Sequence, residues 1–239
     1  MPECKFCGSQ EIVKSGYVRN KQRYKCKNCN KNFVVGDERT NQAIIAKKAL
    51  CVLLYALGKN SFNMIAHLLN LSPSLVYRWV KQAGVNTPEP VVSNEITEIE
   101  FDEMWHFIGK KKRRIWIIKA IDRNTRRTVA WVLGRRDAKT FKKLYEKVKH
   151  LSHCIFYTDN WDAFAKILPK ERHVIGKEHT IAIEQDNSNT RHHLARFTRR
   201  TKVVSKCLFM VDLSLRLWCA LNTPDIFRRY QDKMLYIFR

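Results

Sequence analysis

Four cysteines near the N-terminus have the spacing of ligands for one metal ion. Cys4 and Cys7 form one Cys-x-x-Cys pair, and Cys26 and Cys29 form a second pair after an intervening stretch. Each pair can direct two thiolates at one Zn²⁺, and the stretch between them has the length of a hairpin. Because so short a segment buries little apolar surface, its folding would depend on the metal. The spacing predicts a structural zinc site in a zinc ribbon over residues 1–39.

Carboxylates form a second group with metal-binding chemistry. The segment HCIFYTDNWDAF reads as a short buried strand that ends at Asp159, and Asp102 lies inside an earlier strand-like segment. Divalent cations such as Mg²⁺ or Mn²⁺ prefer hard oxygen ligands, and two facing carboxylates form a site that a substrate phosphate completes. A third carboxylate is expected from a later helix, where Glu178, Glu184 and Asp186 are available.

Other acidic residues compete with these assignments. Glu103 is adjacent to Asp102, and either of the two suits a surface acid. Asp122 ends an apolar strand, but the turn DRNT explains it without catalysis, and Asp162 suits the start of a helix. Asp159 is thus an expected ligand, whereas Asp102 and Glu103 both stay open as the first ligand, with Asp122 as a further alternative.

The charge of the chain points to a polyanionic partner. The 239 residues include 45 Lys and Arg against 22 Asp and Glu, which gives a net charge of +23. Double-stranded DNA is favoured over a membrane, because the sequence has no basic amphipathic helix or lipidation motif and its longest apolar run is too short to span a bilayer. The N-terminus lacks the apolar core of a signal peptide, so we expect a cytoplasmic protein whose cysteines stay reduced.

Residues 40–87 are expected to form an α-helical domain with a helix-turn-helix. The last of three predicted helices starts with Ser72 as N-cap and Pro73 at the first helical position, and Gly84 is expected to end it. A generic three-helix domain is the alternative, but the basic context favours DNA binding. The residues expected to contact DNA from this helix are Ser74, Tyr77, Arg78 and Lys81.

A linker over residues 88–95 contains two prolines, and strand-like segments follow it. Residues 96–239 read as three antiparallel strands, an amphipathic helix and a fourth strand that crosses over to pair in parallel. This is the order of an α/β ribonuclease-H-like domain. In such a sheet the first and fourth strands are neighbours, so Asp102 and Asp159 would face each other.

A basic stretch follows the later acids and carries no acid from Arg191 to Lys206. Such a run is often merely solvated, but beside an acidic metal site it suits a groove that holds a DNA strand. The residues expected to contact DNA here are Asn187, Arg191, Arg196, Arg199, Arg200 and Lys202.

The sequence resembles the transposases of the insertion sequence one family, which belong to the DDE group of recombinases. The matching stretches are FDEMWHF, YTDNWDAFAKILPKERH and HTIAIEQDNSNTRHHLARFTRRTKVVSK, together with the two Cys-x-x-Cys pairs and the helix-turn-helix. The resemblance implies Asp102, Asp159 and Glu184 as an acidic triad that binds Mg²⁺ or Mn²⁺. It also implies zinc and helix-turn-helix modules that bind the terminal inverted repeats of the element.

The expected function is therefore Mg²⁺-dependent DNA cleavage and strand transfer by a prokaryotic, nucleoid-associated transposase. Because both ends of the element must be held together, at least a homodimer is expected in the active complex. Two alternatives remain. A metal-dependent nuclease or resolvase would use the same triad, and a non-enzymatic DNA-binding regulator would use only the zinc and helix-turn-helix modules.

Overall fold

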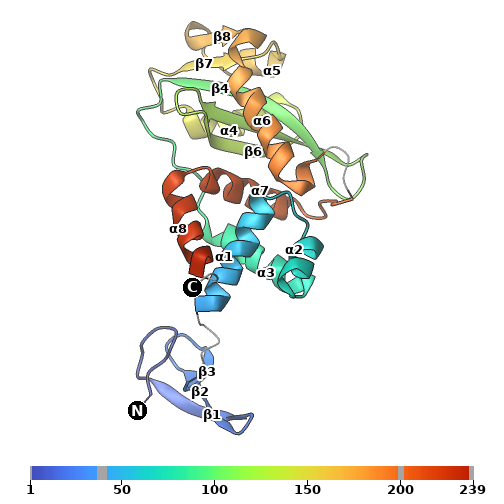
Figure 1. Ribbon diagram of the computed structural model, residues 1–239. Helices are drawn as coiled ribbons and strands as arrows, with labels where there is room; N and C mark the ends of the chain where they lie inside the picture. Colours follow the sequence, from blue (N-terminus) through green and yellow to red (C-terminus); the bar gives the residue numbers. More distant parts are fainter. Residues whose placement is uncertain (1, 37–41, 199–201, 237–239) are drawn as a thin grey trace. The chain divides into compact units, whose positions relative to one another are not determined.

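The computed structural model describes residues 2–36, 42–198 and 202–236, and the chain divides into two compact units, Met1–Ile45 and Ala46–Arg239 (Figure 1). Each unit has its own fold. The finer division predicted above, with boundaries at residues 39, 87 and 95, stays a prediction.

The first unit contains a three-stranded antiparallel sheet in the order β1-β2-β3. Its strands are β1 (Ile12–Val18), β2 (Lys21–Cys26) and β3 (Asn32–Val34). The first two strands are joined by Arg19 and Asn20, which have φ angles of 50° and 60°. A two-residue turn with both φ angles positive matches the twist of a hairpin, which places the two cysteine pairs at the base of β1 and β2.

Three helices follow, α1 (Gln42–Ala56), α2 (Phe62–Leu69) and α3 (Pro73–Asn86). Ser61 and Ser72 cap the second and third helices, as their side chains accept N–H bonds from the first turn. The expectation that Gly84 ends α3 is wrong, since the helix continues for two more residues. A Cβ at Gly84 would lie 2.8 Å from the Cβ of Leu213, so this glycine allows another helix to approach closely.

The centre of the second unit is a five-stranded mixed sheet in the order β6-β5-β4-β7-β8. Its strands are β4 (Glu98–Phe107), β5 (Arg114–Asp122), β6 (Arg127–Gly134), β7 (Ile155–Thr158) and β8 (His173–Ile175). The first three pair antiparallel, whereas β7 runs parallel to β4 and to β8. The expectation that the first and fourth strands of this region are neighbours is confirmed, and the mixed α/β architecture is consistent with a ribonuclease-H-like domain.

Helices cover both faces of this sheet (Figure 1). The helices that follow β6 are α4 (Ala138–Val148), α5 (Asp162–Ala165), α6 (Ile181–His193), α7 (Leu208–Leu221) and α8 (Pro224–Leu235), of which α8 packs on α7; 3₁₀ turns lie at Lys170–Arg172, Lys177–His179 and Ala195–Phe197. Helix α4 packs on β5 and β6, and α6 packs on β4 and β5. Because side chains alternate along a strand, β4 sends Phe101 into the cluster under α4 and Met104 into a cluster on the opposite face.

The cluster on the α6 and α7 face also contains the helices that precede the sheet. Val52 of α1, Ile65 of α2 and Val80 of α3 share it with Trp131 of β6 and Leu215 of α7. Helices α1 to α3 are thus buried against the same apolar core as the sheet and do not have a separate one.

Candidate functional site

The four N-terminal cysteines form a compact sulfur cluster. The Sγ atoms of Cys4 and Cys29 are 3.6 Å apart, as are those of Cys7 and Cys26, and all four sulfurs lie within 4.8 Å of one another. The backbone N–H of Cys29 donates to the Cys26 sulfur and lowers the pKa of that thiol to about 6. Four converging thiols, one of them favoured as thiolate, fit the donor set of a tetrahedral zinc ion.

A second cluster lies where β7 ends. Phe101 and Thr158 are the last paired residues of the parallel strands β4 and β7, and Asp102 and Asp159 come next on each chain segment. Carboxylate oxygens of Asp102, Glu103 and Asp159 all lie within 4.8 Å of one another. The topology therefore brings together two aspartates that are far apart in the sequence, as well as a glutamate that was expected to compete with one of them.

Asp102 is held in place by helix α6. The side-chain amide of Asn187 donates to its Oδ2 atom over 2.8 Å. Burial raises the pKa of Asp102, and the nearby charges of Asp159 and Glu184 raise it further, although the Asn187 hydrogen bond opposes them. Negative charge is thus concentrated at a partly desolvated point, which is the electrostatic condition for binding a cation.

The loop after β7 positions Asp159. Its side chain accepts the backbone N–H of Trp161 at 3.1 Å, which folds the loop back, and Thr158 donates its hydroxyl to the Asp159 carbonyl at 2.7 Å. The ring of His173 on β8 lies 2.7 Å from the same hydroxyl. Neighbouring Asp162 is the first residue of α5, as expected.

The three later carboxylates have different surroundings. Glu184 is exposed in the first turn of α6 and close enough to raise the Asp102 pKa, although it is outside the 4.8 Å group. Glu178 is exposed on a 3₁₀ turn beside His179. Asp186 forms an ion pair with Lys119 and is not among the clustered carboxylates. Of the three, Glu184 is the one on the side of α6 that faces the cluster.

The Asp122 carboxylate accepts hydrogen bonds within its own turn. One of its oxygens accepts the N–H of Asn124 at 3.0 Å, and the other accepts the hydroxyl of Thr125 at 2.6 Å. These bonds match the turn interpretation of DRNT.

Contacts with buried polar residues of the sheet fix helix α6 over it. Glu100 is 2% exposed and accepts the N–H of Ile183 at 2.9 Å. Lys119, which is fully buried, binds Asp186 and donates to Thr190 at 3.2 Å. Sequence reasoning missed this anchor, although a lysine inside the apolar run IWIIKAI was a signal for a buried partner.

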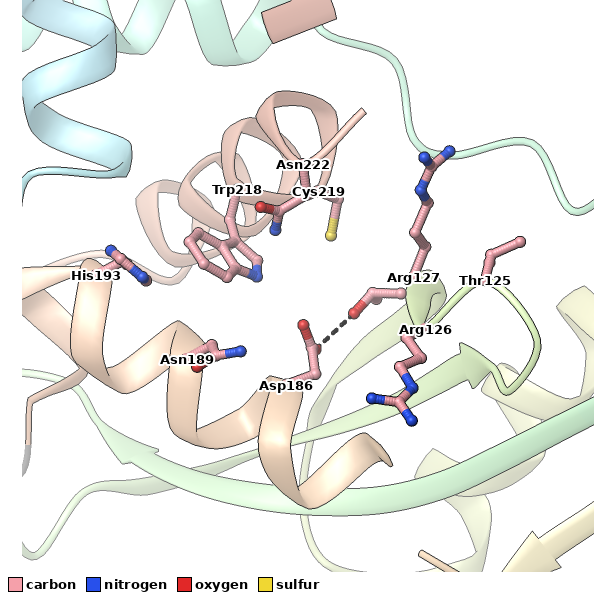
Figure 2. Close-up of a pocket in the computed structure, with 10 residues that line it drawn as sticks. Thr125, Arg126, Arg127, Asp186, Asn189, His193, Trp218, Cys219 and Asn222 are labelled. Carbon is pink, nitrogen blue, oxygen red and sulfur yellow. Dashed lines mark hydrogen bonds between the residues drawn. The ribbon is translucent and has the colours of Figure 1, made fainter. Parts of the chain in front are cut away.

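A cavity of about 350 Å³ lies beside that anchor, and Asp186 and Asn189 of α6 line it (Figure 2). In Figure 2, Arg126 and Arg127 are at its edge and the indole of Trp218 lies inside it, and the hydroxyl of Thr128 donates to Asp186 at 2.7 Å. It is separate from the metal-binding candidates.

The residues of α3 that were expected to contact DNA lie in two environments. Ser74 and Arg78 are exposed. Tyr77 is half-buried with its ring edge-on to Phe62, and Lys81 is half-buried with its ammonium 5.9 Å from the ring of Phe209. The first pair is therefore the more accessible surface.

Two residues of the basic stretch are not placed for phosphate contact. Arg196 is only 6% exposed, and its guanidinium lies over the rings of Tyr55 and Phe62, at 5.6 and 6.0 Å. Asn187 is 7% exposed and binds Asp102. Both expectations require correction, because apolar packing and the acidic cluster take up these side chains.

The remaining residues of that stretch are less uniform. Arg191 is half-buried and donates to the carbonyls of Trp105 and Phe197 at 3.2 and 3.4 Å. Lys202 is exposed. Arg199 and Arg200 lie outside the described residues.

The chain thus combines a four-cysteine cluster with a mixed α/β sheet that carries clustered carboxylates. The sequence model of the IS1 transposase family matches residues 95–218, which include the whole sheet and the carboxylate cluster. The chain belongs to this family.

Curated relatives agree with that assignment. The chain is 36% identical over 113 residues to the insertion element IS1 protein InsB of Shigella flexneri, covering 47% of this chain and 86% of the relative. It is 37% identical over 120 residues to the insertion element IS1 2 protein InsB of Escherichia coli K12, a match that covers 50% of this chain and 72% of the relative. These matches support a transposase.

Among solved structures, a chain of a simian T-cell lymphotropic virus intasome in complex with the PP2A regulatory subunit B56 gamma aligns with 13% identity and a TM-score of 0.36, covering 71% of this chain and 68% of that one. Within the described part of the protein, no helix combines the length and apolar character needed to cross a bilayer.

Proposed function

We propose that the protein is a DDE transposase that cleaves DNA at the ends of its insertion element and joins the freed ends to target DNA. The observation that carries the proposal is the placement of Asp102 and Asp159 side by side, directly after the last paired residues of the parallel strands β4 and β7, in a chain of the IS1 transposase family. Glu184, on the facing side of α6, completes the proposed triad.

The residues present fit a Mg²⁺ or Mn²⁺ ion. The cluster offers hard carboxylate oxygens at short mutual distances, and such ions prefer this donor type. When bound, a divalent cation supplies an activated water and stabilises the charge that develops on a phosphodiester.

The chain's own residues orient the reacting groups. Asp102 is fixed by Asn187 and Asp159 by its turn with Trp161, so the two carboxylates need little rearrangement to act together. A freed 3′-OH held at the same site would attack a target phosphodiester directly. This second step is a transesterification: it forms one phosphodiester as it breaks another, releases the target's 3′-OH, and needs no external energy source.

The N-terminal parts would hold the DNA. We propose that the four cysteines bind a structural Zn²⁺ and that α2 and α3 act as a helix-turn-helix, with Ser74 and Arg78 exposed toward the terminal repeat. The net charge of +23 supports an extensive phosphate contact. Joining two ends in one complex would require at least a dimer.

The test is Mg²⁺-dependent cleavage of a duplex that carries the terminal repeat, compared at equal DNA occupancy. Asp159→Asn keeps the shape of the side chain but removes its charge, so the cleavage rate should fall by about 10³-fold or more while DNA binding holds. Adding Asp102→Asn should cost little further, because both residues serve one site.

Two variants serve as controls. Asp122→Asn changes a turn carboxylate outside the cluster and should cleave at nearly the normal rate. Arg78→Ala should lower DNA occupancy but not the rate per bound complex. Near-normal cleavage by Asp159→Asn would refute the proposed mechanism, and cleavage without strand joining by the unmodified protein would indicate a nuclease instead.

A further inference from the structure

Glu103 has a buried carboxylate that is only half satisfied. Its side chain is 6% exposed, and its Oε1 atom accepts hydrogen bonds from Arg136, with distances of 2.7 Å to Nε and 2.6 Å to Nη2. Its Oε2 atom is buried and has no hydrogen-bond partner among the described residues. An unsatisfied buried carboxylate oxygen is costly, on the order of 1–3 kcal/mol or more, so it calls for a partner.

The position of Glu103 shows where that partner would be. Neighbouring side chains on a strand point to opposite faces, so Asp102 and Glu103 leave β4 on different sides. Both nevertheless have an oxygen within 4.8 Å of one on Asp159. On one side Asp102 still pairs with β5, but on the other side the pairing with β7 ends at Phe101 and Thr158, so no strand separates the two faces of the sheet there. Carboxylates from both faces therefore converge on Asp159.

Glu103 lies among like charges. Burial raises the pKa of Glu103, the Arg136 hydrogen bond lowers it, and the charges of Asp102 and Asp159 raise it again. Arg136 binds Glu103 only through Oε1, whereas carboxylate oxygens of Asp102 and Asp159 lie within 4.8 Å of one on Glu103. A divalent cation between the carboxylates would relieve both the repulsion and the unsatisfied oxygen.

Building on the proposed function, we propose that Glu103 is a further ligand of the catalytic cation, which it binds through Oε2 together with Asp102 and Asp159. Arg136 then acts as a positioning residue. It lies over the rings of Trp161 and Trp116, at 4.7 and 5.3 Å, and holds Glu103 by Oε1, which leaves Oε2 available to the cation.

The competing explanation is that Glu103 serves only to hold Arg136 between the two tryptophans. The two explanations differ in one respect. If Glu103 is a ligand, its loss directly weakens binding of the cation, whereas loss of Arg136 leaves the ligand in place. If Glu103 is only an anchor, substituting Glu103 and substituting Arg136 change the affinity for the cation by the same factor.

The experiment is a titration of the zinc-loaded, full-length protein with Mn²⁺, followed by the electron paramagnetic resonance signal of free Mn²⁺ without DNA. Glu103→Gln should weaken Mn²⁺ binding by about tenfold or more, because affinity for such ions depends on the number of charged ligands. Arg136→Gln should change the Kd by less than about threefold. Glu98→Gln is the matched control, since Glu98 is on the same strand beside Arg123 but outside the cluster, and it should bind Mn²⁺ normally.

Each outcome decides between the explanations. Normal Mn²⁺ binding by Glu103→Gln, or equal weakening by Glu103→Gln and Arg136→Gln, would overturn the assignment. Asp159→Asn separates this proposal from the proposed function: if it binds Mn²⁺ normally, the whole cation site is wrong, but if it alone loses Mn²⁺, only Glu103 is misassigned. Should Glu103→Gln fail to fold, Glu103→Asp keeps the charge but withdraws the carboxylate by one methylene, and it should also weaken Mn²⁺ binding.

Discussion

The two candidate metal clusters are assembled in opposite ways. The cysteine cluster is built from two Cys-x-x-Cys pairs at the base of one hairpin, so its ligands are neighbours in the sequence as well as in space. The carboxylate cluster takes Asp102 from β4 and Asp159 from the residue directly after β7, and these meet only because the sheet places the two strands side by side.

This difference determines what each cluster contributes to its unit. The first unit has a small buried group of Cys4, Cys26 and Phe33, too little apolar surface to fold alone. The second unit has two large apolar clusters, one on each face of its sheet. We therefore expect the first unit to fold only with its metal bound and the second unit to fold without metal.

The largest expected effect is the loss of zinc. Cys26→Ser in the full-length protein should abolish stoichiometric zinc binding and unfold residues 2–36, because apo sites of this kind are unfolded. Metal analysis and amide chemical shifts of the first unit would measure this. Cys51→Ser, which changes a buried cysteine of the second unit, should keep the zinc. A first unit that folds without zinc would contradict the inference that its folding depends on the metal.

A smaller but still large effect should follow from breaking the anchor of α6. Asp186→Asn leaves the buried ammonium of Lys119 without its counter-charge, which should lower the free energy of unfolding of the second unit by about 3–5 kcal/mol. Chemical denaturation measures this, and Asp232→Asn on the exposed side of α8 is the control. The paired change Lys119→Met with Asp186→Leu should recover much of the loss, and no loss in the single variant would show that the anchor is not stabilising.

The smallest expected effect concerns pH. Burial, followed by the charges of Arg196 and Arg191, lowers the pKa of His106 to about 4, and this ring lies 2.8 Å from the hydroxyl of Ser205. Between about pH 6.5 and 4 the unfolded chain therefore takes up a proton that the folded chain excludes. The free energy of unfolding should fall with decreasing pH across this window, by up to about 3 kcal/mol.

Two substitutions test that assignment. His106→Gln should remove this part of the pH dependence, whereas His150→Gln, at an exposed position, should leave it unchanged. Denaturation curves at several pH values measure both. An unaltered pH dependence in His106→Gln would mean that other groups of the second unit are responsible.

The features that the sequence predicted correctly are those whose residue pattern has a single physical explanation. The cysteine spacing predicted the sulfur cluster, and the strand order predicted that Asp102 and Asp159 would be neighbours. Both inferences rest on rules of local geometry and topology that hold whatever the other side chains do.

Sequence reasoning failed where the partner of a side chain decides its role. Arg196 reads as one more basic residue in a basic stretch, but it is buried over Tyr55 and Phe62. Gly84 reads as a helix end, but it makes room for Leu213. Glu103 was expected to compete with Asp102, but both have a carboxylate oxygen within 4.8 Å of one on Asp159. Alternation along a strand does not reveal that the pairing with β7 stops at that point.

The apolar cluster shared by α1 to α3 and the sheet limits how the chain can be divided. Val52, Ile65 and Val80 are at most 2% exposed, and their cover includes Trp131 and Leu215 from beyond the proline-containing linker. In a shortened product that ended at the linker, these side chains would be exposed to solvent, and the product would aggregate or bind another apolar surface. Helices α1 to α3 are therefore not a detachable module: to remain soluble they need the sheet that carries the carboxylates.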